Sequence, residues 1–193
     1  MKTLKRSITV LVCLILFTSC TKSIDGEKED AYIEIREEIT YYKGTPFTGE
    51  IFENYNNGQL YYKINFKDGK QDGLSEWYYE NGQLQYKDNF KDGNRDGLSE
   101  FYYENGQLQR KANYKDGELD GLSEQYHENG QLKGKGNFID GKVDGLSEVY
   151  YENGKLQVKE NWKDGKLNGL VEQYYKNGQL IYKQNYKDGK KID

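Results

Sequence analysis

The chain contains few side chains that could take part in catalysis. Its only histidine, His127, occupies a position that tyrosine holds in neighbouring segments of similar sequence, at Tyr79, Tyr103, Tyr151 and Tyr175. A histidine that replaces one member of an aromatic row is expected to pack as the others do, rather than to act as a base or a metal ligand. The sequence has no Ser-His-Asp set and no glycine-rich loop that opens a helix. It therefore predicts a protein that is not an enzyme and that needs no metal or cofactor.

Glutamate recurs at a fixed spacing, and two carboxylates on neighbouring strands could flank a glycosidic bond. Each of these glutamates is predicted to face a lysine across a hairpin. A nearby cation lowers the pKa of a carboxyl group, whereas an acid catalyst needs a raised one. The predicted pairs are Glu76–Lys87, Glu100–Lys111, Glu124–Lys135, Glu148–Lys159 and Glu172–Lys183. Such pairs contribute about 0.2–1 kcal/mol each, so this ladder fixes the register more than it stabilises the sheet.

The motif Asp-Gly-x-x-Asp-Gly recurs at residues 68–73, 92–97, 116–121 and 140–145. Carboxylates at repeated tight turns bind calcium in some β-solenoids, which gives one interpretation of the motif. Each turn, however, offers too few oxygen atoms for the roughly six to eight ligands that calcium takes. We favour the other interpretation, in which aspartate is a turn-forming residue.

The N-terminal segment is predicted to be an export signal. A basic start precedes an apolar run over residues 7–17, which is too short to span a bilayer. Phe17-Thr18-Ser19-Cys20 resembles the lipobox of a bacterial lipoprotein signal, with Phe in place of the usual Leu and Ser in place of Gly or Ala. The resemblance implies cleavage before Cys20 and a lipid on its thiol. The alternative is an ordinary signal peptide that is cut nearby and leaves Cys20 as a lone thiol.

These features divide the chain into four parts, which are a signal peptide over 1–19, a flexible tether over 20–30, N-terminal capping strands over 31–48, and repeats over 49–192. The tether is predicted because its residues are polar and charged, without an apolar period. The chain has 28 Lys and Arg residues against 32 Asp and Glu residues, and this acidic balance argues against binding to nucleic acid. We expect an exported lipoprotein that is anchored to a membrane, in the cell envelope or at the cell surface.

Glycine recurs with a 24-residue period in three series, which begin at Gly49, Gly58 and Gly69, so one unit has been copied six times. The second and third series complete Asn-Gly and Asp-Gly dipeptides, and both dipeptides suit a two-residue type I′ turn. The segments between these turns are short and rich in Tyr, Phe, Leu and Val, as strands are. The sequence predicts an all-β fold: an elongated, single, twisted antiparallel meander of six 24-residue hairpin repeats.

Two-residue turns also predict the strand register. Across Asn81-Gly82 the facing pairs are Tyr79–Leu84, Trp77–Tyr86, Ser75–Asp88 and Gly73–Phe90, and across Asp92-Gly93 they are Phe90–Arg95 and Leu84–Phe101. One face then carries an aromatic and leucine stripe, in which Gly73 makes room for a ring. The other face carries the Glu–Lys ladder, flanked by tyrosines. The strand over residues 179–187 is predicted to be an exposed edge whose lysines oppose edge-to-edge pairing, with self-association through edge strands as an alternative.

The repeat resembles a known family. Tyr150-Tyr151-Glu152-Asn153-Gly154 and Asn185-Tyr186-Lys187-Asp188-Gly189-Lys190 are similar to the variant form of MORN repeats (membrane occupation and recognition nexus), and the resemblance covers residues 41–192. The chain looks like the bacterial group whose members are often labelled YwqK-type antitoxins. The resemblance implies roles as antitoxins, scaffolds or surface factors of invasive bacteria. An antitoxin role would require that the toxin is exported too.

Tyrosine forms a regularly spaced row on the predicted charged face, at Tyr78, Tyr102, Tyr126, Tyr150 and Tyr174. Rings that lie half in water are good anchors for protein or glycan, and a repeated row adds avidity. We therefore predict a non-catalytic array that presents this surface to a protein partner, host- or envelope-directed. A glycan or cell-wall binding module is the alternative, since Trp77-Tyr78-Tyr79 resembles one turn of bacterial cell-wall-binding repeats. An antitoxin is the second alternative.

Overall fold

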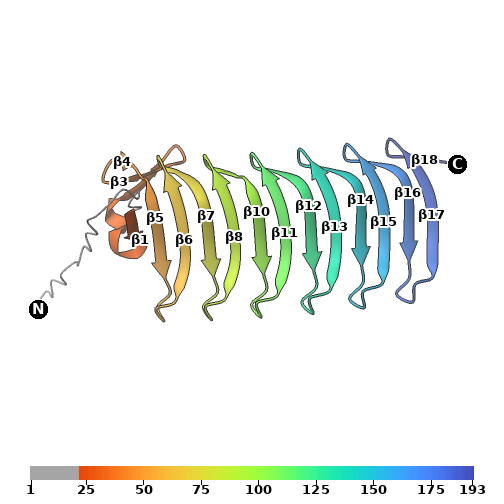
Figure 1. Ribbon diagram of the computed structural model, residues 1–193, viewed down its shortest axis with the longest axis horizontal. Helices are drawn as coiled ribbons and strands as arrows, with labels where there is room; N and C mark the ends of the chain where they lie inside the picture. Colours follow the sequence, from red (N-terminus) through yellow and green to blue (C-terminus); the bar gives the residue numbers. More distant parts are fainter. Residues whose placement is uncertain (1–21) are drawn as a thin grey trace, which may run out of the picture.

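The computed structural model describes residues 22–193, and nearly all of them lie in one long row of strands (Figure 1). From β5 onward, strands that follow each other in the chain lie side by side in a 15-stranded sheet. The strands of the repeats are β5 (Gly49–Asn54), β6 (Leu60–Lys67), β7 (Lys70–Tyr78), β8 (Leu84–Lys91), β9 (Asn94–Arg95), β10 (Gly97–Tyr102), β11 (Leu108–Lys115), β12 (Glu118–Tyr126), β13 (Leu132–Ile139), β14 (Lys142–Tyr150), β15 (Leu156–Lys163), β16 (Lys166–Tyr174), β17 (Leu180–Lys187) and β18 (Lys190–Ile192). The predicted all-β, elongated meander of six hairpin repeats is confirmed.

The N-terminal end of the sheet carries a small cap. Its elements are β1 (Lys22–Asp25), α1 (Gly26–Glu29), the 3-10 turn η1 (Asp30–Tyr32), β2 (Ile33–Arg36), β3 (Ile39–Tyr42) and β4 (Thr45–Pro46). β1 pairs with β5 in parallel and forms the first edge of the long sheet, whereas β2, β3 and β4 form a separate three-stranded sheet. The capping strands expected over residues 31–48 therefore form a sheet of their own rather than extending the meander.

The structure differs from the flexible tether predicted for residues 20–30 in the part that it describes. Residues 22–25 are a strand, and Asp25 accepts a hydrogen bond from the backbone N–H of Lys28 at the start of α1. Ile24 is 3% exposed and packs against Tyr42, Phe47 and Ile51. The pairing of β1 with β5, the Asp25 cap and the buried Ile24 together hold a stretch whose composition is otherwise that of a linker.

The cap builds the main hydrophobic core of the described residues. Tyr42 and Phe47 pack on Ile51, and Phe66 of the first repeat lies 6.0 Å from Phe47 between ring centroids. Backbone hydrogen bonds tie the cap to the β6–β7 turn, from Thr40 N–H to the Gly69 carbonyl and from Gly69 N–H to the Phe47 carbonyl. The rest of the sheet is a single layer without such a core, so its strands must be held together by contacts within the sheet.

The two kinds of turn differ. At the Asp-Gly turns both residues have positive φ, as at Asp92 (50°) and Gly93 (92°), so the predicted type I′ turn is confirmed. At the Asn-Gly turns only the glycine does, as at Gly82 (84°). There the Gly82 N–H donates to the Tyr79 carbonyl, and the Tyr79 N–H donates to the Gln83 carbonyl. These are longer loops in which glycine ends the turn with a bulge, so the two-residue turn predicted at Asn-Gly is wrong.

The register follows the prediction in the middle of each hairpin and beside the Asp-Gly turn, and it departs from the prediction beside the Asn-Gly turn and beyond the bulge that follows the Asp-Gly turn. Trp77–Tyr86, Ser75–Asp88, Gly73–Phe90 and Phe90–Arg95 face each other as predicted. The predicted pairs Tyr79–Leu84 and Leu84–Phe101 are wrong, because Leu84 faces Tyr78 and Phe101 faces Tyr86. The second change is a shift of two residues, and since side chains alternate with period two it leaves every residue on its predicted face.

The shift arises where the strand bulges at the glycine series that includes Gly97. Gly97 has φ +108°, and a Cβ added there would lie 3.3 Å from Cβ of Asn89. Asn89 in turn donates from Nδ2 to the Leu98 carbonyl at 2.7 Å. The glycine was expected to make room for a ring, but it is an asparagine side chain that covers it. This glycine is needed for the bulge.

The strand over residues 179–187 was expected to be the exposed C-terminal edge of the sheet, but a further short strand covers part of it. β17 corresponds to the predicted edge strand, but β18 pairs with its last three residues, from Asn185 to Lys187. Residues 180–184 of β17 keep an unpaired outer side within the described sheet, and Leu180 and Tyr182 are 49% and 42% exposed. Lysines 190 and 191 lie on β18 itself.

Candidate binding surface

The charged residues of the long sheet form one continuous row, which together with its flanking tyrosines we call the ladder face. In register order the row is Lys63, Glu76, Lys87, Glu100, Lys111, Glu124, Lys135, Glu148, Lys159, Glu172 and Lys183. All five predicted pairs face each other, and each lysine up to Lys159 also faces the glutamate of the next repeat. Without the two-residue shift at the bulge, Lys87 would face Leu98, so the bulge turns separate pairs into a ladder.

Most of the short ion pairs cross from one repeat to the next rather than lying within a hairpin. Lys87 Nζ lies 2.6 Å from Glu100 Oε2, and Lys111 Nζ lies 2.6 Å from Glu124 Oε2. Two pairs lie within a hairpin instead: Lys183 Nζ lies 3.1 Å from Glu172 Oε1, and Lys159 Nζ lies 3.9 Å from Glu148 Oε1. The glutamates are the more buried partners, with side chains 12–16% exposed against 33–55% for the lysines. The lysine ammonium groups therefore lie nearer to the solvent.

The pKa values of the ladder reflect this pairing. Hydrogen bonds to the glutamates raise the pKa of Lys63, Lys87, Lys111 and Lys135. Burial opposes ionisation of Glu148, but hydrogen bonds from Lys135 and Tyr150 outweigh it and lower its pKa. Both effects favour the charged forms of these four lysines and of Glu148.

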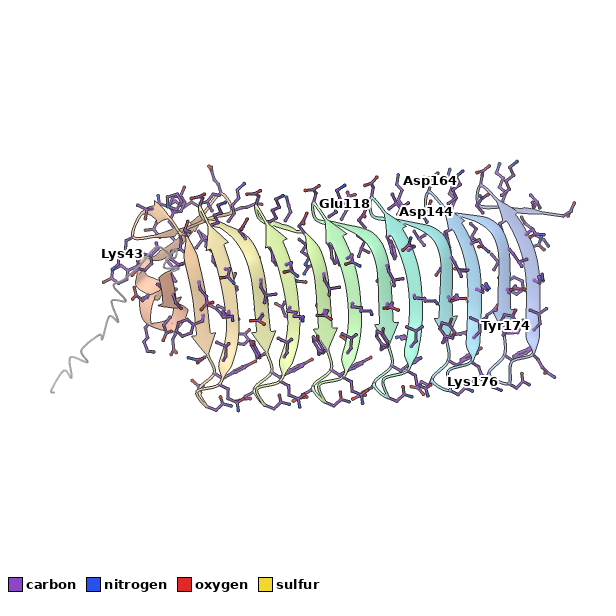
Figure 2. The ribbon with its side chains drawn as sticks, in the orientation of Figure 1. Lys43, Glu118, Asp144, Asp164, Tyr174 and Lys176 are labelled. Carbon is purple, nitrogen blue, oxygen red and sulfur yellow. The ribbon has the colours of Figure 1, made fainter. Side chains whose placement is uncertain are left out.

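The five predicted tyrosines lie half-buried on this face, next to the glutamates two residues earlier in the same strands. Tyr126 and Tyr150 donate from their hydroxyls to Glu124 and Glu148, at 3.3 and 2.9 Å. Burial, with the neighbouring glutamate, raises the pKa of the tyrosines at positions 78, 102, 150 and 174. Figure 2 shows Tyr174 on its strand among side chains spread along the whole sheet. The structure thus brings the predicted tyrosines together in one row, each ring oriented by its carboxylate.

Leucine adds an apolar element to the same face. Leu98, Leu122 and Leu146 precede the ladder glutamates by two residues and are 37%, 42% and 39% exposed. Each central repeat therefore presents a leucine, a glutamate and a tyrosine along one strand, with lysine and asparagine on the next. With strands about 4.8 Å apart, this set recurs every ~10 Å. A surface of this composition resembles the mixed apolar and polar patches through which proteins bind one another.

The opposite face, which we call the ring face, is not uniform. Trp77 stacks on Tyr86 with ring centroids 4.3 Å apart, and Tyr86 stacks on Phe101 at 5.4 Å. Tyr62 extends this row toward the cap, and Arg110 follows Phe101 at 6.0 Å from its ring. From there the same register positions hold small, polar or aliphatic residues, namely Gln125, Gly134, Val149, Val158 and Gln173. The row of stacked rings is therefore continuous only near the N-terminal end, whereas the positions that face the glycine series of Gly97 hold an aromatic ring in every repeat, as at Phe90 and Trp162.

A buried polar cluster lies beneath these rings, and the sequence prediction missed its role. Asp88 is 1% exposed, accepts a hydrogen bond from the Ser99 hydroxyl and lies 3.1 Å from Arg95 Nε. Ser75, which faces Asp88, is fully buried, and its hydroxyl has no partner among the described residues. The signal in the sequence is that Asp88 stands where the other repeats have residues such as Ile64 and Ala112.

His127 lies at the position that tyrosine occupies in the other repeats, and it makes the equivalent contact. The hydroxyls of Tyr79 and Tyr103 donate to the carbonyls of Tyr102 and Tyr126, each in the following repeat. Nε2 of His127 lies 3.1 Å from the corresponding carbonyl, that of Tyr150. Because a carbonyl only accepts, Nε2 carries the proton in this contact. These hydrogen bonds therefore link the Asn-Gly ends of successive repeats.

The aspartates of the Asp-Gly-x-x-Asp-Gly motif link successive repeats at the opposite ends of the strands. Asp72 Oδ2 accepts from the backbone N–H of Asp92 in the next turn at 3.2 Å, and Asp144 accepts from Asp164 in the same way at 3.0 Å. Figure 2 shows Asp144 and Asp164 at this end of the strands. Within residues 22–193 no group of three His, Cys, Asp or Glu side chains is placed to hold a metal ion. The motif is thus explained by turn geometry and by contacts between repeats.

Cys20 and the predicted signal peptide lie outside the described residues. Over residues 22–193, no helix is both long and apolar enough to cross a membrane.

Comparison with known proteins identifies the repeat. A family model described as "MORN repeat variant" matches six consecutive segments, residues 47–68, 71–92, 95–116, 119–140, 143–164 and 167–188, which together make up more than half of the chain. No curated protein matches the sequence. Among solved structures, one similar chain comes from the crystal structure of a GtfA/B complex bound to UDP and GlcNAc, with 10% identity and a TM-score of 0.27 over 64% of this chain. The match spans 24% of that chain's length.

Proposed function

This chain belongs to the MORN repeat variant family, and from this premise we propose that it is a non-catalytic array whose ladder face binds a protein partner. The observation that carries the proposal is the repeated set of an exposed leucine, an oriented tyrosine and a Glu–Lys pair on one face. Tyrosine anchors with polar groups beside them are typical of protein interfaces. Because the set recurs every ~10 Å, several weak contacts with an extended or repetitive partner would add up by multivalency.

We also propose that the array is exported and held at a membrane by a lipid on Cys20. The basic start, the apolar run and the lipobox-like Phe17-Thr18-Ser19-Cys20 support this. β1 begins at Lys22, only two residues after Cys20. A lipid there would place the cap within about 7 Å of the bilayer surface, with the array extending away from it. Fatty-acid labelling of cells should mark the chain, and Cys20→Ala should abolish the label and release the protein from membranes.

Photo-crosslinking at two adjacent positions of β12 tests the protein-binding proposal. Tyr126 lies on the ladder face, where it contacts Glu124, whereas Gln125 lies on the ring face beside Gly134. A photoreactive phenylalanine analogue at position 126 should give a discrete protein adduct in cells, and the same analogue at 125 should not. The pair shares strand, repeat and distance from the membrane, so each position is the control for the other. Adducts at 125 alone, or at neither position, would contradict the proposal.

Replacing three ladder-face tyrosines gives a second test. The variant Tyr102→Ala, Tyr126→Ala, Tyr150→Ala should lose the adduct formed from a probe at position 174, while its circular dichroism remains that of the folded sheet. Three exposed turn glutamates, Glu104, Glu128 and Glu152, changed to alanine form the control and should leave the adduct unchanged. Full crosslinking by the tyrosine variant would show that this row does not hold the partner.

Glycan binding is a second candidate, and the ring face supports it. The stack of Trp77, Tyr86 and Phe101 is a continuous aromatic surface of the kind on which sugar rings can lie. Sedimentation with purified cell-wall polymer separates the two candidates. Under this alternative the chain should sediment with the polymer and Trp77→Ala should not, whereas the ladder-face proposal expects neither protein to sediment.

A further inference from the structure

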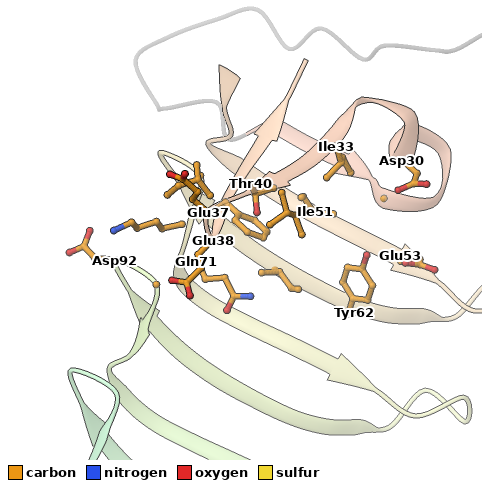
Figure 3. A pocket seen from close by; sticks show the side chains of 18 of the residues that line it. Asp30, Ile33, Glu37, Glu38, Thr40, Ile51, Glu53, Tyr62, Gln71 and Asp92 are labelled. Carbon is orange, nitrogen blue, oxygen red and sulfur yellow. The ribbon is translucent and has the colours of Figure 1, made fainter. Parts of the chain in front are cut away.

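A large cavity lies between the cap and the ring face of the first repeat. Its volume is about 960 Å³, and it opens between β2 and β3 of the cap on one side and β6 and β7 of the long sheet on the other. Figure 3 shows labelled side chains of both parts around this space, with Ile33 and Thr40 from the cap and Ile51 and Tyr62 from the sheet. A cavity of this size exceeds what one side chain or ion would fill and matches sites that hold a small organic molecule or several residues of a peptide.

The inner wall of the cavity is apolar. Ile33 and Ile39 contribute from the cap, and Ile51, Ile64 and Phe66 contribute from the sheet. Ile51 is 6% exposed and belongs to the core, so this wall is held rigidly. It would accommodate an aliphatic group.

The rim of the cavity is acidic. Six carboxylates line it, those of Glu27, Asp30, Glu37, Glu38, Glu53 and Asp92, against a single cation, Lys70. None of the six lies in an ion pair with a side chain that the structure describes. This contrasts with the ladder face, where every glutamate is paired. A negative rim over an apolar wall complements a group with an aliphatic stem and a cationic end.

The edge of β2 indicates how such a group would be presented. β2 is the outer strand of the cap sheet and pairs with β3 alone among the described strands. Its residues Ile33 and Ile35 line the cavity, and Ile35 is 74% exposed. An extended peptide added along this edge would gain backbone hydrogen bonds, and its alternate side chains would point into the cavity.

We propose that the cap cavity is a second binding site, specific for an extended peptide segment that carries basic residues at alternate positions. A lysine or arginine of the segment lays its stem along Ile39 and Ile64 and sets its charge among Glu37, Glu38 and Asp92. The site is separate from the ladder face, and it does not depend on the function proposed for that face.

The experiment measures fluorescence anisotropy of a fluorescein-labelled peptide of alternating lysine and valine, added to the purified chain. The expected result is saturable binding that weakens with salt. The same peptide with glutamate in place of lysine should not bind. A peptide N-methylated at alternate backbone positions should bind about tenfold more weakly, because it cannot complete the hydrogen bonds to β2. Free butylamine should not displace the peptide at equal concentration.

Two variants of the protein with the same change in net charge test whether the cavity carboxylates hold the peptide. Glu37→Gln, Glu38→Gln, Asp92→Asn should weaken binding about tenfold. Glu104→Gln, Glu128→Gln, Glu152→Gln makes the same change in net charge at distant exposed turns and should keep the affinity within about twofold. Equal weakening by both variants, undiminished binding by the cavity variant, or displacement by butylamine would each overturn the proposal. If the cavity variant does not fold, the glutamate and N-methylated peptides on the unaltered protein still decide it.

Discussion

Lys87 bonds to Glu100 of the following repeat, at 2.6 Å, although the turn spacing pairs it with Glu76 of its own hairpin. It faces both glutamates in the sheet, because the bulge around Gly97 shifts the next strand by two residues. The ladder therefore couples successive repeats, which in a single-layer sheet is where cohesion is needed. An array of this kind is stable only as far as its neighbouring units hold each other.

The first prediction concerns this pair. A double-mutant cycle with Lys87→Met and Glu100→Gln should give a coupling free energy of about 0.5–1 kcal/mol, at the upper end for exposed pairs. The matched cycle with Lys87→Met and Glu76→Gln should give a smaller value, because Glu76 is paired with Lys63 at 3.0 Å. Urea unfolding of the six proteins measures both. Equal couplings would mean that the repeat boundary has no special part in the ladder.

The second prediction separates the two reasons for glycine at the bulge. Gly169 and Gly145 both have positive φ, 122° and 95°, so alanine is strained at each. An added Cβ would lie 3.0 Å from Cβ of Asn161 at position 169, but 4.0 Å from Cβ of Asn137 at position 145. Gly145→Ala should cost about 1 kcal/mol and Gly169→Ala about 1 kcal/mol more, as shifts in the urea midpoint. A larger cost at 145 would show that crowding by asparagine is irrelevant.

How far the sequence predicts this structure depends on the range of the interactions. The Asp-Gly turns, the two faces and the pairing of Glu76 with Lys87 follow from period-two alternation and from local turn chemistry. The two-residue turn predicted at Asn-Gly is wrong because glycine in that dipeptide suits both a two-residue turn and a longer bulged loop. The bulge at Gly97 was missed because this glycine series was assigned to make room for rings, as Gly73 for Phe90, whereas Asn89 covers Gly97.

The cap and its cavity could not be predicted in the same way. They bring α1 and β2 together with the Asp92 turn, which lies two repeats further along the chain and shares no motif or period with them. The order of residues 22–30 rests on the pairing of β1 with β5 and on the burial of Ile24 in the core, and composition indicates neither. The structure of the repeats can be predicted because the same local pattern recurs six times, whereas the cap has no repeated pattern.

The third prediction uses two serines in equivalent positions of successive repeats. The buried hydroxyl of Ser75 has no partner, so Ser75→Ala should leave stability unchanged or raise it by up to about 1 kcal/mol. The Ser99 hydroxyl donates to the buried Asp88, so Ser99→Ala should cost about 1–3 kcal/mol. Thermal and urea unfolding of the two variants tests the difference. Destabilisation of similar size in both would indicate that packing at these positions, and not hydrogen bonding, sets the cost.

The fourth prediction is a loss of stability at high pH. Four ladder lysines (63, 87, 111 and 135) and Tyr86 have raised pKa values in the folded chain, Tyr86 to about 12 because it is buried and lies near the charge of Asp88. A group with a raised pKa contributes stability below its unfolded pKa, about 10 for tyrosine and lysine, and this is lost as the pH rises through the folded value. The urea midpoint should hold from pH 7 to 9 and fall between about pH 10 and 12.

Two variants check the origin of this alkaline loss. Tyr86→Phe removes one titrating group and should make the fall with pH shallower. Tyr175→Phe, at an exposed ring in the last repeat, should leave the slope unchanged. A midpoint that rises with pH in the unaltered chain would show that the sign of these shifts is wrong.

The fifth prediction concerns the row of hydroxyls at the Asn-Gly ends. Tyr103 donates to the Tyr126 carbonyl of the next repeat at 2.9 Å, so Tyr103→Phe leaves that carbonyl without its partner and should cost about 0.5–1.5 kcal/mol. Tyr175 holds the same position in the sixth repeat, is 54% exposed and faces no carbonyl of a further repeat among the described residues, so Tyr175→Phe should be neutral. His127→Tyr restores the side chain of the row and should preserve stability, whereas His127→Phe should lose as much as Tyr103→Phe. Hydrogen exchange should then show faster opening at the joint between the affected repeats, because each unit is held only by its neighbours. Loss at Tyr175 equal to that at Tyr103 would mean that the ring, and not its bond to the next repeat, stabilises the array.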